Sequence, residues 1–206
     1  VIAGKIYLIG RSPGFGPEEE QRTDRVDIYD PAADTWGKGR KMPTRRDPFT
    51  VEVANDHIYV IGGYGWPMIP NNPGPRLTVI EEYNPITNQW RQKNDMLELK
   101  DGFGTTVVRD AIYLIGGVVL GKFIATVDVY QPQTQKWSDI PALPNPLVNH
   151  SAAVVNGKIY VFGGFKAIGE FSSDVVVYDT SFRAVEANGK MLTHWGALKA
   201  EPQHQP

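Results

Sequence analysis

The sequence predicts an all-β fold built from about four repeated units, each of four short strands. The first observation is that three tyrosine-to-tryptophan steps have the same length of seven positions. The second is that each of these tryptophans lies 23 positions before the tyrosine of a later apolar segment. Conserved internal spacing of this kind indicates a repeat protein, since nothing has been inserted into those segments. The three steps are Tyr29 to Trp36, Tyr83 to Trp90 and Tyr130 to Trp137.

Each repeat reads as strands a, b, c and d in chain order. Runs rich in Val, Ile, Tyr and Thr alternate with Gly, Pro, Asn and Asp every eight to twelve residues, which favours strands over helices. Two-residue turns are expected between a and b, and Asx-Pro or Gln-Pro pairs open the c to d turns. In the second repeat the expected strands are Phe49–Ala54, His57–Ile61, Thr78–Tyr83 and Gln89–Arg91.

Length variation up to Tyr178 falls in one place per repeat, the connection from strand b to strand c. The tyrosine-to-tyrosine step across it is 22, 24, 17 and 18 positions in the successive repeats. Because antiparallel strands alternate in direction, the b to c and d to a connections lie at one end of each repeat and the short turns at the other. The variable loops are therefore expected to share one face.

A period near 50 with four strands per repeat is typical of a β-propeller blade. Strand b ends in a double glycine at Ile61-Gly62-Gly63, Ile115-Gly116-Gly117 and Phe162-Gly163-Gly164, followed by the spaced Tyr and Trp. This pattern resembles the kelch repeat. The resemblance implies a kelch-type β-propeller, or a propeller segment, with glycines at close backbone approaches and the Tyr and Trp residues buried between blades.

The repeats predict one propeller segment at 1–200 followed by a tail at 201–206. Approximate blades are 1–40, 41–93, 94–140 and 141–200. The first repeat is expected to begin at strand b, and in the last the tryptophan after Tyr178 is Trp195, 17 positions on, so 189–195 is expected to form a displaced strand d. A fragment of a larger propeller is favoured, then an oligomer, then a closed four-bladed ring.

Composition excludes several classes of protein. The chain has 206 residues and a net charge of −2, which does not suggest a nucleic-acid binder. Without an 18-residue apolar stretch no membrane association is expected, and the absence of cysteine excludes disulfides and Cys metal sites. The compartment stays open, with a bacterial or extracellular origin favoured.

Enzymatic chemistry finds no support in the residues. A galactose-oxidase-like copper site needs a cysteine, and the iron-binding spacing of nitrile-specifier proteins is broken at Val60. The four histidines are scattered, and none has metal-ligand spacing to another. No cofactor or metal is expected, and the chain leans away from being an enzyme. His150 follows a d to a connection, so it either faces the binding mouth or caps a strand end.

Binding has better support. Arg46, Lys100 and Leu147 stand at equivalent positions, each 12 residues before a strand b isoleucine. Kelch adaptor domains use such loops, so the resemblance implies that Arg46 and Lys100 contact an anionic group, with aromatic residues beside them. The candidate ligand-binding residues are Arg46, Tyr64, Trp66, Arg76, Lys100, Phe103, His150, Phe165 and Lys166.

The predicted function is a non-catalytic recognition module that binds a protein or peptide through the b–c and d–a loops. One alternative is a carbohydrate-binding or carbohydrate-active propeller, in which loop aromatics and amides contact a sugar. Another is a structural segment of a larger multidomain protein. Self-association, or further blades from a longer chain, is also expected.

Overall fold

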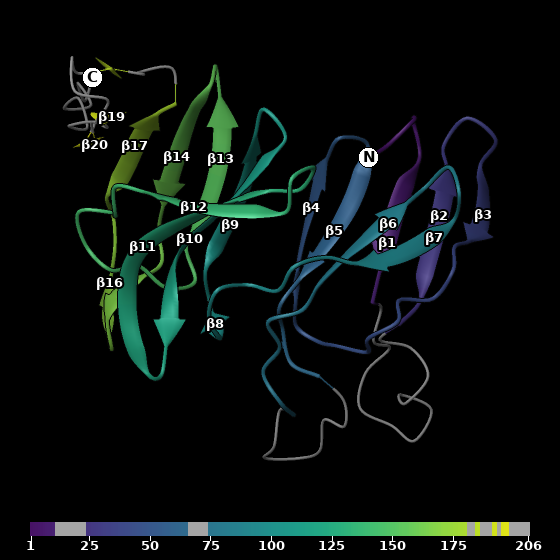
Figure 1. Cartoon of the computed structure of the whole chain (residues 1–206), viewed down its shortest axis with the longest axis horizontal. Coiled ribbons are helices and arrows are strands. Elements are labelled where there is room, and N and C mark those ends of the chain that lie inside the picture. Colours follow the sequence, from purple (N-terminus) through teal and green to yellow (C-terminus); the bar gives the residue numbers. More distant parts are fainter. Residues whose placement is uncertain (11–23, 66–73, 181–183, 186–190, 193–194, 198–206) are drawn as a thin grey trace, which may run out of the picture. The chain divides into compact units, whose positions relative to one another are not determined.

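The computed structural model describes residues 1–10, 24–65, 74–180, 184–185, 191–192 and 195–197. Within these residues every regular element is a β-strand and every sheet is antiparallel, which confirms the predicted all-β class. The chain divides into two compact units, Val1–Leu99 and Lys100–Pro206. Each unit contains two sheets of the predicted blade type (Figure 1).

Blade 1 is a three-stranded sheet in unit 1, in the order β1-β2-β3. Just before β1, Ile2 pairs with Lys5 across Ala3 and Gly4, whose φ angles are 48° and 75°. This is the same two-residue turn that joins strands a and b in the other blades. The first described strand is β1, at the strand b position as expected, and Ile2 adds a single bridged residue before it. The strands are β1 (Ile6–Ile9), β2 (Val26–Asp30) and β3 (Thr35–Lys38).

Blade 2 completes unit 1 with four strands in sequence order, close to the bounds expected from the sequence. Asn55 and Asp56, at φ 49° and 57°, form the a to b turn. The Asn84 side chain accepts hydrogen bonds from the backbone N–H groups of Ile86 and Thr87, which fixes the c to d turn. The strands are β4 (Thr50–Ala54), β5 (His57–Ile61), β6 (Ile80–Asn84) and β7 (Gln89–Gln92).

Blade 3 opens unit 2, and its two central strands continue past the double glycine. They pair beyond a bulge near Gly116 and end in a hairpin whose tip is Leu120 and Gly121. A short strand from the preceding connection pairs with this extension. The strands are β8 (Lys100–Asp101), β9 (Gly104–Val108), β10 (Ala111–Val119), β11 (Lys122–Gln131) and β12 (Lys136–Ile140).

Blade 4 has a displaced strand d, as expected, but only Trp195 of the predicted segment 189–195 belongs to it, because Met191 and Leu192 form part of a separate hairpin. Trp195 pairs with Tyr178, the register that Trp36, Trp90 and Trp137 have with their own tyrosines. The blade strands are β13 (Ser151–Val155), β14 (Lys158–Phe162), β17 (Val175–Asp179) and β20 (Trp195–Ala197). Two small hairpins accompany them, β15 (Phe165–Ala167) with β16 (Glu170–Phe171) and β18 (Ala184–Val185) with β19 (Met191–Leu192).

The aromatic pairs are arranged differently from the expectation. Tyr83 and Tyr130 are fully buried, whereas Trp90 and Trp137 are half-buried and Trp36 is 61% exposed. Each tryptophan stacks on its own tyrosine with ring centroids 4.8–5.0 Å apart. Strand d is the outermost strand of its blade, so its tryptophan covers the tyrosine from outside. The prediction of largely buried tryptophans is therefore wrong for Trp36.

Candidate binding surface

The b–c loops and d–a connections meet at one end of each unit, as the strand directions predict. In blade 2 Arg46 pairs with Gly65 through the backbone, and the Asp47 N–H donates to the carbonyl of Tyr64. In blade 4 Val148 pairs with Phe165 in the same way. In blades 2 and 4 the connection that enters the blade is thus bonded to residues that follow the double glycine.

The double glycines make this close approach possible. Gly63 has a φ of +90°, and a Cβ built on it would lie 2.3 Å from the carbonyl oxygen of Pro48. A Cβ on Gly117 would lie 2.6 Å from the Asp101 carbonyl oxygen. Contacts this short are not available to any residue with a side chain, and a positive φ is itself unfavourable for other residues. The proposed role of the glycines is therefore confirmed.

Arg46 occupies a different environment from that of an exposed ligand contact. Its side chain is fully buried, and its guanidinium donates to Glu81 Oε2 at 2.7 Å and to the carbonyls of Gly62 and Val79 at 2.9 and 2.7 Å. Burial lowers the pKa of Arg46, and the carboxylate of Glu81 opposes that change. The expectation that Arg46 contacts an anionic ligand is corrected, because its anion is Glu81.

Lys100 repeats this arrangement in blade 3. It is buried, and its ammonium group is paired with Asp128 and close to Thr126. Asp128 faces Leu114 in the same register in which Glu81 faces Val60, so the two acids are equivalent. The candidate role of Lys100 in binding an anion is therefore corrected in the same way.

His150 is also buried rather than placed in an open mouth. A Cβ on Gly104 would lie 2.6 Å from its Nε2 atom, and one on Gly116 would lie 3.0 Å from its Cε1 atom. The imidazole thus lies against the backbone of two glycines. Burial lowers the pKa of His150 to about 4, with only weak opposition from the backbone of Leu147.

Two of the candidates in unit 1 lie together on the b–c loop of blade 2. Tyr64 pairs through the backbone with Arg76, whose Nε donates to the Tyr64 hydroxyl at 3.3 Å. The guanidinium carbon is 5.9 Å from the centre of the Tyr64 ring, a cation–π distance. Arg76 is exposed and Tyr64 is half-buried. The third candidate on this loop, Trp66, lies outside the described residues.

The candidates in unit 2 are partly accessible. Phe165 and Phe103 are half-buried, and Phe165 stacks on Phe171 with ring centroids 4.7 Å apart. Lys166 forms a 2.7 Å ion pair with Asp174, which raises the pKa of Lys166. The hairpin of β15 and β16 is therefore held in shape by an aromatic stack and an ion pair.

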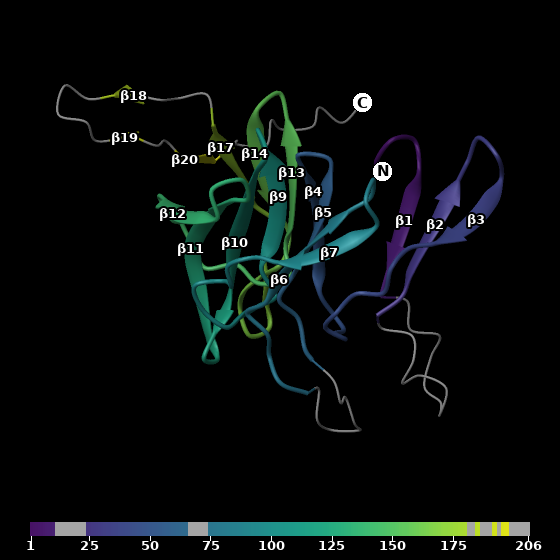
Figure 2. The ribbon, with the colours of Figure 1, turned by 45° about the vertical axis from the view of Figure 1, so that its right-hand side comes forward.

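The exposed tips of the two hairpins in unit 2 include two residues that were not among the candidates. Leu120 at the tip of β10–β11 and Ile168 between β15 and β16 are highly exposed, as is Phe171. Both hairpins project from the same end of unit 2 (Figures 1 and 2). The Leu-Gly and Ile-Gly dipeptides at 120–121 and 168–169 are turn signals that mark these tips in the sequence.

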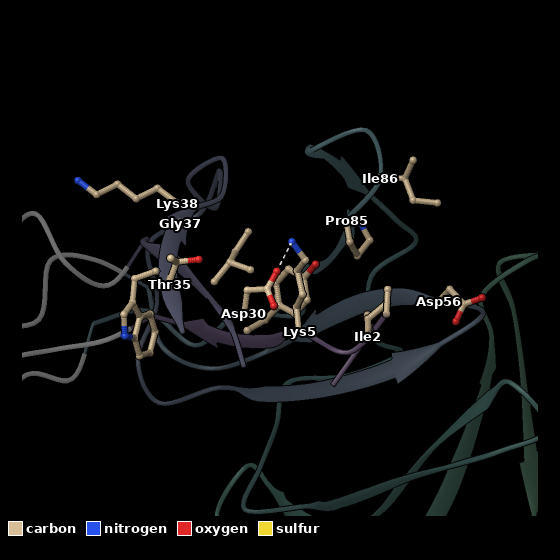
Figure 3. Close-up of a pocket in the computed structure, with 13 residues that line it drawn as sticks. Ile2, Lys5, Asp30, Thr35, Gly37, Lys38, Asp56, Pro85 and Ile86 are labelled. Atoms are coloured by element: carbon tan, nitrogen blue, oxygen red, sulfur yellow. Dashed lines mark ion pairs between the residues drawn. The ribbon is translucent and has the colours of Figure 1, made fainter. Parts of the chain in front are cut away.

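In unit 1 a cavity of about 600 Å³ lies at the end that carries the a to b and c to d turns, where no site was expected. Lys5 points towards Asp30 within it, and the two form a 3.1 Å ion pair (Figure 3). Pro85 and Ile86 contribute from the c to d turn of blade 2. Lys38 and Asp56 also line the cavity, so it offers charged groups as well as apolar contacts.

The described residues hold no group of three or more His, Cys, Asp or Glu side chains that could bind a metal ion. No helix in the described part of the chain is long and apolar enough to cross a membrane.

Comparison with known proteins matches this arrangement. The model of the Kelch motif matches residues 45–97, 101–144 and 146–184, more than half of the chain. Kelch repeat and BTB domain-containing protein 12 of Homo sapiens is 32% identical over 179 residues, which cover 80% of this chain and 29% of that protein. Kelch-like protein 40 of Xenopus laevis is 31% identical over 171 residues, 83% of this chain and 26% of that protein.

More distant relatives extend the comparison. Alpha-scruin of Limulus polyphemus is 26% identical over 202 residues, 87% of this chain and 22% of that protein. The chain therefore spans less than a third of each of these relatives. Among solved structures, that titled "Structure of YjhT" superposes with a TM-score of 0.74, covering all of this chain and 65% of the other at 19% identity. That likeness supports the fold alone.

Proposed function

We propose, from the premise that this chain belongs to the kelch-repeat family and has the kelch-type β-propeller fold, that it is a non-catalytic recognition module for a protein or peptide. The binding surface is the end of the blades formed by the b–c loops and d–a connections. Kelch repeats cover most of the chain, and the loops at this end are where the repeats differ.

The observation that carries the proposal is the group of exposed apolar tips in unit 2. Leu120, Ile168 and Phe171 are all highly exposed and all belong to b–c loops. Large apolar side chains of this kind, when several occur together at one end, favour contact with another protein. Their hairpins are braced by backbone pairing and by the Lys166–Asp174 ion pair, so binding costs little ordering.

The buried pairs change which residues are expected to contact the ligand. Arg46 and Lys100 support the connections from inside, while the accessible groups are Arg76 in unit 1 and the hairpin tips in unit 2. Within unit 1, Arg76 lies over the ring of Tyr64, and arginine and tyrosine are both enriched in interface hot spots. Within unit 2 the exposed tips are apolar, so they match a ligand with apolar side chains.

Panning a displayed random-peptide library against the 206-residue chain tests the proposal. The loop variant Leu120→Ser/Ile168→Ser/Phe171→Ser should bind the enriched peptides at least about tenfold more weakly than the unmodified chain, as expected for interface anchors. The control Ile86→Ser/Val155→Ser removes two exposed apolar side chains from the turn end and should bind normally. Equal loss in both variants, no enriched peptide, or enrichment on a glycan array instead would reject the proposal.

A further inference from the structure

The cavity between blades 1 and 2 of unit 1 is not used by the proposed function. Its volume is about 600 Å³, and all of its lining residues belong to unit 1. Sites for small organic molecules measure roughly 300–1,000 Å³ and combine mainly apolar walls with a few polar groups. The size of the cavity therefore suits a small molecule, and its lining decides which kind.

The floor of the cavity is a row of three residues on blade 1. Tyr7, Ile28 and Gly37 oppose one another on strands b, c and d, and all three line the cavity. Apart from its chain neighbours, the nearest atom to a Cβ built on Gly37 would be the Ile28 carbonyl oxygen, at 3.9 Å. The φ angle of Gly37 is not positive. The backbone therefore does not require a glycine here, and its missing side chain leaves open space.

The same row in blade 2 is polar. Glu82 stands where blade 1 has Ile28. Its carboxylate accepts a hydrogen bond from the Tyr59 hydroxyl at 2.6 Å and lies 3.4 Å from the Lys93 ammonium group. In blade 1 the tyrosine of this row, Tyr7, faces an isoleucine, and its hydroxyl makes no hydrogen bond to a described residue. The cavity floor thus joins an apolar surface to an available hydroxyl.

One wall of the cavity is the c to d turn of blade 2. Pro85 and Ile86 line it, and Ile86 is 91% exposed. Asn84 Oδ1 accepts hydrogen bonds from the backbone N–H groups of Ile86 and Thr87, at 2.9 and 3.0 Å. Ile2, which is buried, closes the cavity towards the core. Because these hydrogen bonds fix the turn, the apolar wall is already formed and a ligand costs little ordering.

The polar centre of the cavity is the ion pair of Lys5 and Asp30. The two side chains point towards each other, with 3.1 Å between Nζ and Oδ2 (Figure 3). Asp30 Oδ1 also accepts the N–H of Ala32 at 3.0 Å, and the hydrogen bond from Lys5 lowers the pKa of Asp30. An ammonium group has three N–H donors, of which Asp30 takes one. Lys5 therefore has donors left for a ligand, whereas both oxygens of Asp30 are engaged.

Two further charged residues line the cavity, Lys38 and Asp56. Lys38 is exposed and forms no ion pair with a described residue. Asp56 lies on the far side of Ile2 as seen from the ion pair (Figure 3). A negative group bound at Lys5 is therefore separated from Asp56, and the other acid in the cavity is already neutralised.

We propose that this cavity binds a small molecule with an apolar body and one carboxylate group. The apolar body lies against Ile28 and Ile86, over the open space at Gly37. The carboxylate accepts hydrogen bonds from Lys5 and from the hydroxyl of Tyr7, two residues that share one side of an extended segment. The cavity lies at the turn end of the blades and the proposed protein-binding surface at the loop end, so the two proposals are independent.

Isothermal titration calorimetry with two small acids tests the class of ligand. The acids are 3-phenylpropionate and 4-methylpentanoate, each compared with its amide, and 3-phenylpropylamine carries the opposite charge. At least one acid should bind the 206-residue chain about tenfold more tightly than its amide, as expected for hydrogen bonds from a charged donor. Equal binding of acids and amides, tighter binding of the amine, or no binding of either acid at millimolar concentration would overturn the proposal.

Two variants and a matched control locate the site. Gly37→Leu fills the open space and should weaken binding of the acid at least about tenfold, as Lys5→Met should by removing the donor. The control Lys158→Met removes the lysine of the equivalent 3.1 Å ion pair with Asp179 in blade 4, where Lys158 is 45% exposed like Lys5. It should bind the acid normally. Unchanged binding in both Gly37→Leu and Lys5→Met, or an equal loss in Lys158→Met, would overturn the proposal, and urea unfolding shows that each variant is folded.

Discussion

Replacing Arg46 by leucine should destabilise the fold rather than weaken ligand binding. Arg46 makes three short hydrogen bonds inside the protein, to Glu81 and to the carbonyls of Gly62 and Val79. Without it, the buried carboxylate of Glu81 retains the hydroxyl of Thr44, which donates at 2.7 Å, but loses its counter-ion. Removing one partner of a buried ion pair costs about 3–5 kcal/mol, so a loss of that size in the free energy of unfolding is expected.

Blade 4 indicates how the damage can be limited. The equivalent pair there is Leu147 and Val176, two buried apolar residues of one core. The double variant Arg46→Leu/Glu81→Val copies this pair and leaves no charge behind. It should therefore lose no more stability than either single variant, with a coupling energy of about 3 kcal/mol at the upper end of the range for residues in contact. The carbonyls of Gly62 and Val79 prevent full recovery.

Urea unfolding of the 206-residue chain, followed by circular dichroism, measures these differences in the free energy of unfolding. The comparison holds when the slope of free energy against urea concentration is the same for all variants. Arg45→Leu is the matched control. Arg45 is partly exposed, and the 3.5 Å distance from its Nε to Asp24 Oδ2 is longer than the 2.7 Å between Arg46 and Glu81. Its change should stay within about 0.5 kcal/mol, as for most surface substitutions. If Arg46→Leu shifts the midpoint as little as Arg45→Leu and instead abolishes peptide binding, the structural role assigned to Arg46 is wrong.

Two further predictions concern the buried backbone contacts and the buried histidine. Gly63→Ala should cost several kcal/mol, since its Cβ would lie 2.3 Å from the Pro48 carbonyl, whereas Gly121→Ala, also at positive φ but with open space around it, should cost only about 1 kcal/mol in the same urea assay. The pKa of His150 is lowered from 6.5 to about 4 in the folded state, so the neutral imidazole favours folding. The free energy of unfolding therefore keeps its full value above pH 6.5 and falls by about 3 kcal/mol as the pH drops towards 4. Urea midpoints between pH 7 and 4 should fall less in His150→Gln than in the unmodified chain, and parallel curves would contradict this.

The spacing of Tyr, Trp and Gly was sufficient to predict the strands, because each of these residues meets a requirement of the backbone or of the ring stacking within its own blade. A double glycine is needed where the backbone approaches within contact distance, and a two-residue turn needs positive φ at both positions. Trp195 was found at strand d despite its displacement, because its pairing with Tyr178 requires only that the chain return to the same register. Such features are visible in a single sequence.

Burial of charged residues was not visible in that way. Arg46 lies in a connection, and a charged residue in a loop is usually exposed. Its partner Glu81 is 35 positions away, on strand c. The local pattern predicts that strand correctly but does not indicate which residue Glu81 contacts. Similarly, the tryptophans were expected to be buried because of their size, although the strand that carries them is the outermost of its blade. In both cases the outcome depends on which neighbour covers the residue.

The repeats themselves contain the missing information when their positions are compared in pairs. Where the connection carries Arg46, strand c carries Glu81, and where it carries Lys100, strand c carries Asp128. Where it carries Leu147, strand c carries Val176. Charge is thus matched by charge and an apolar residue by an apolar residue, which is the pattern of a packing contact within one blade. A side chain reserved for a ligand has no reason to change together with a residue of the scaffold. The matched pairs therefore identify these connections as supports, which agrees with the proposal that recognition falls to side chains nearer the loop tips.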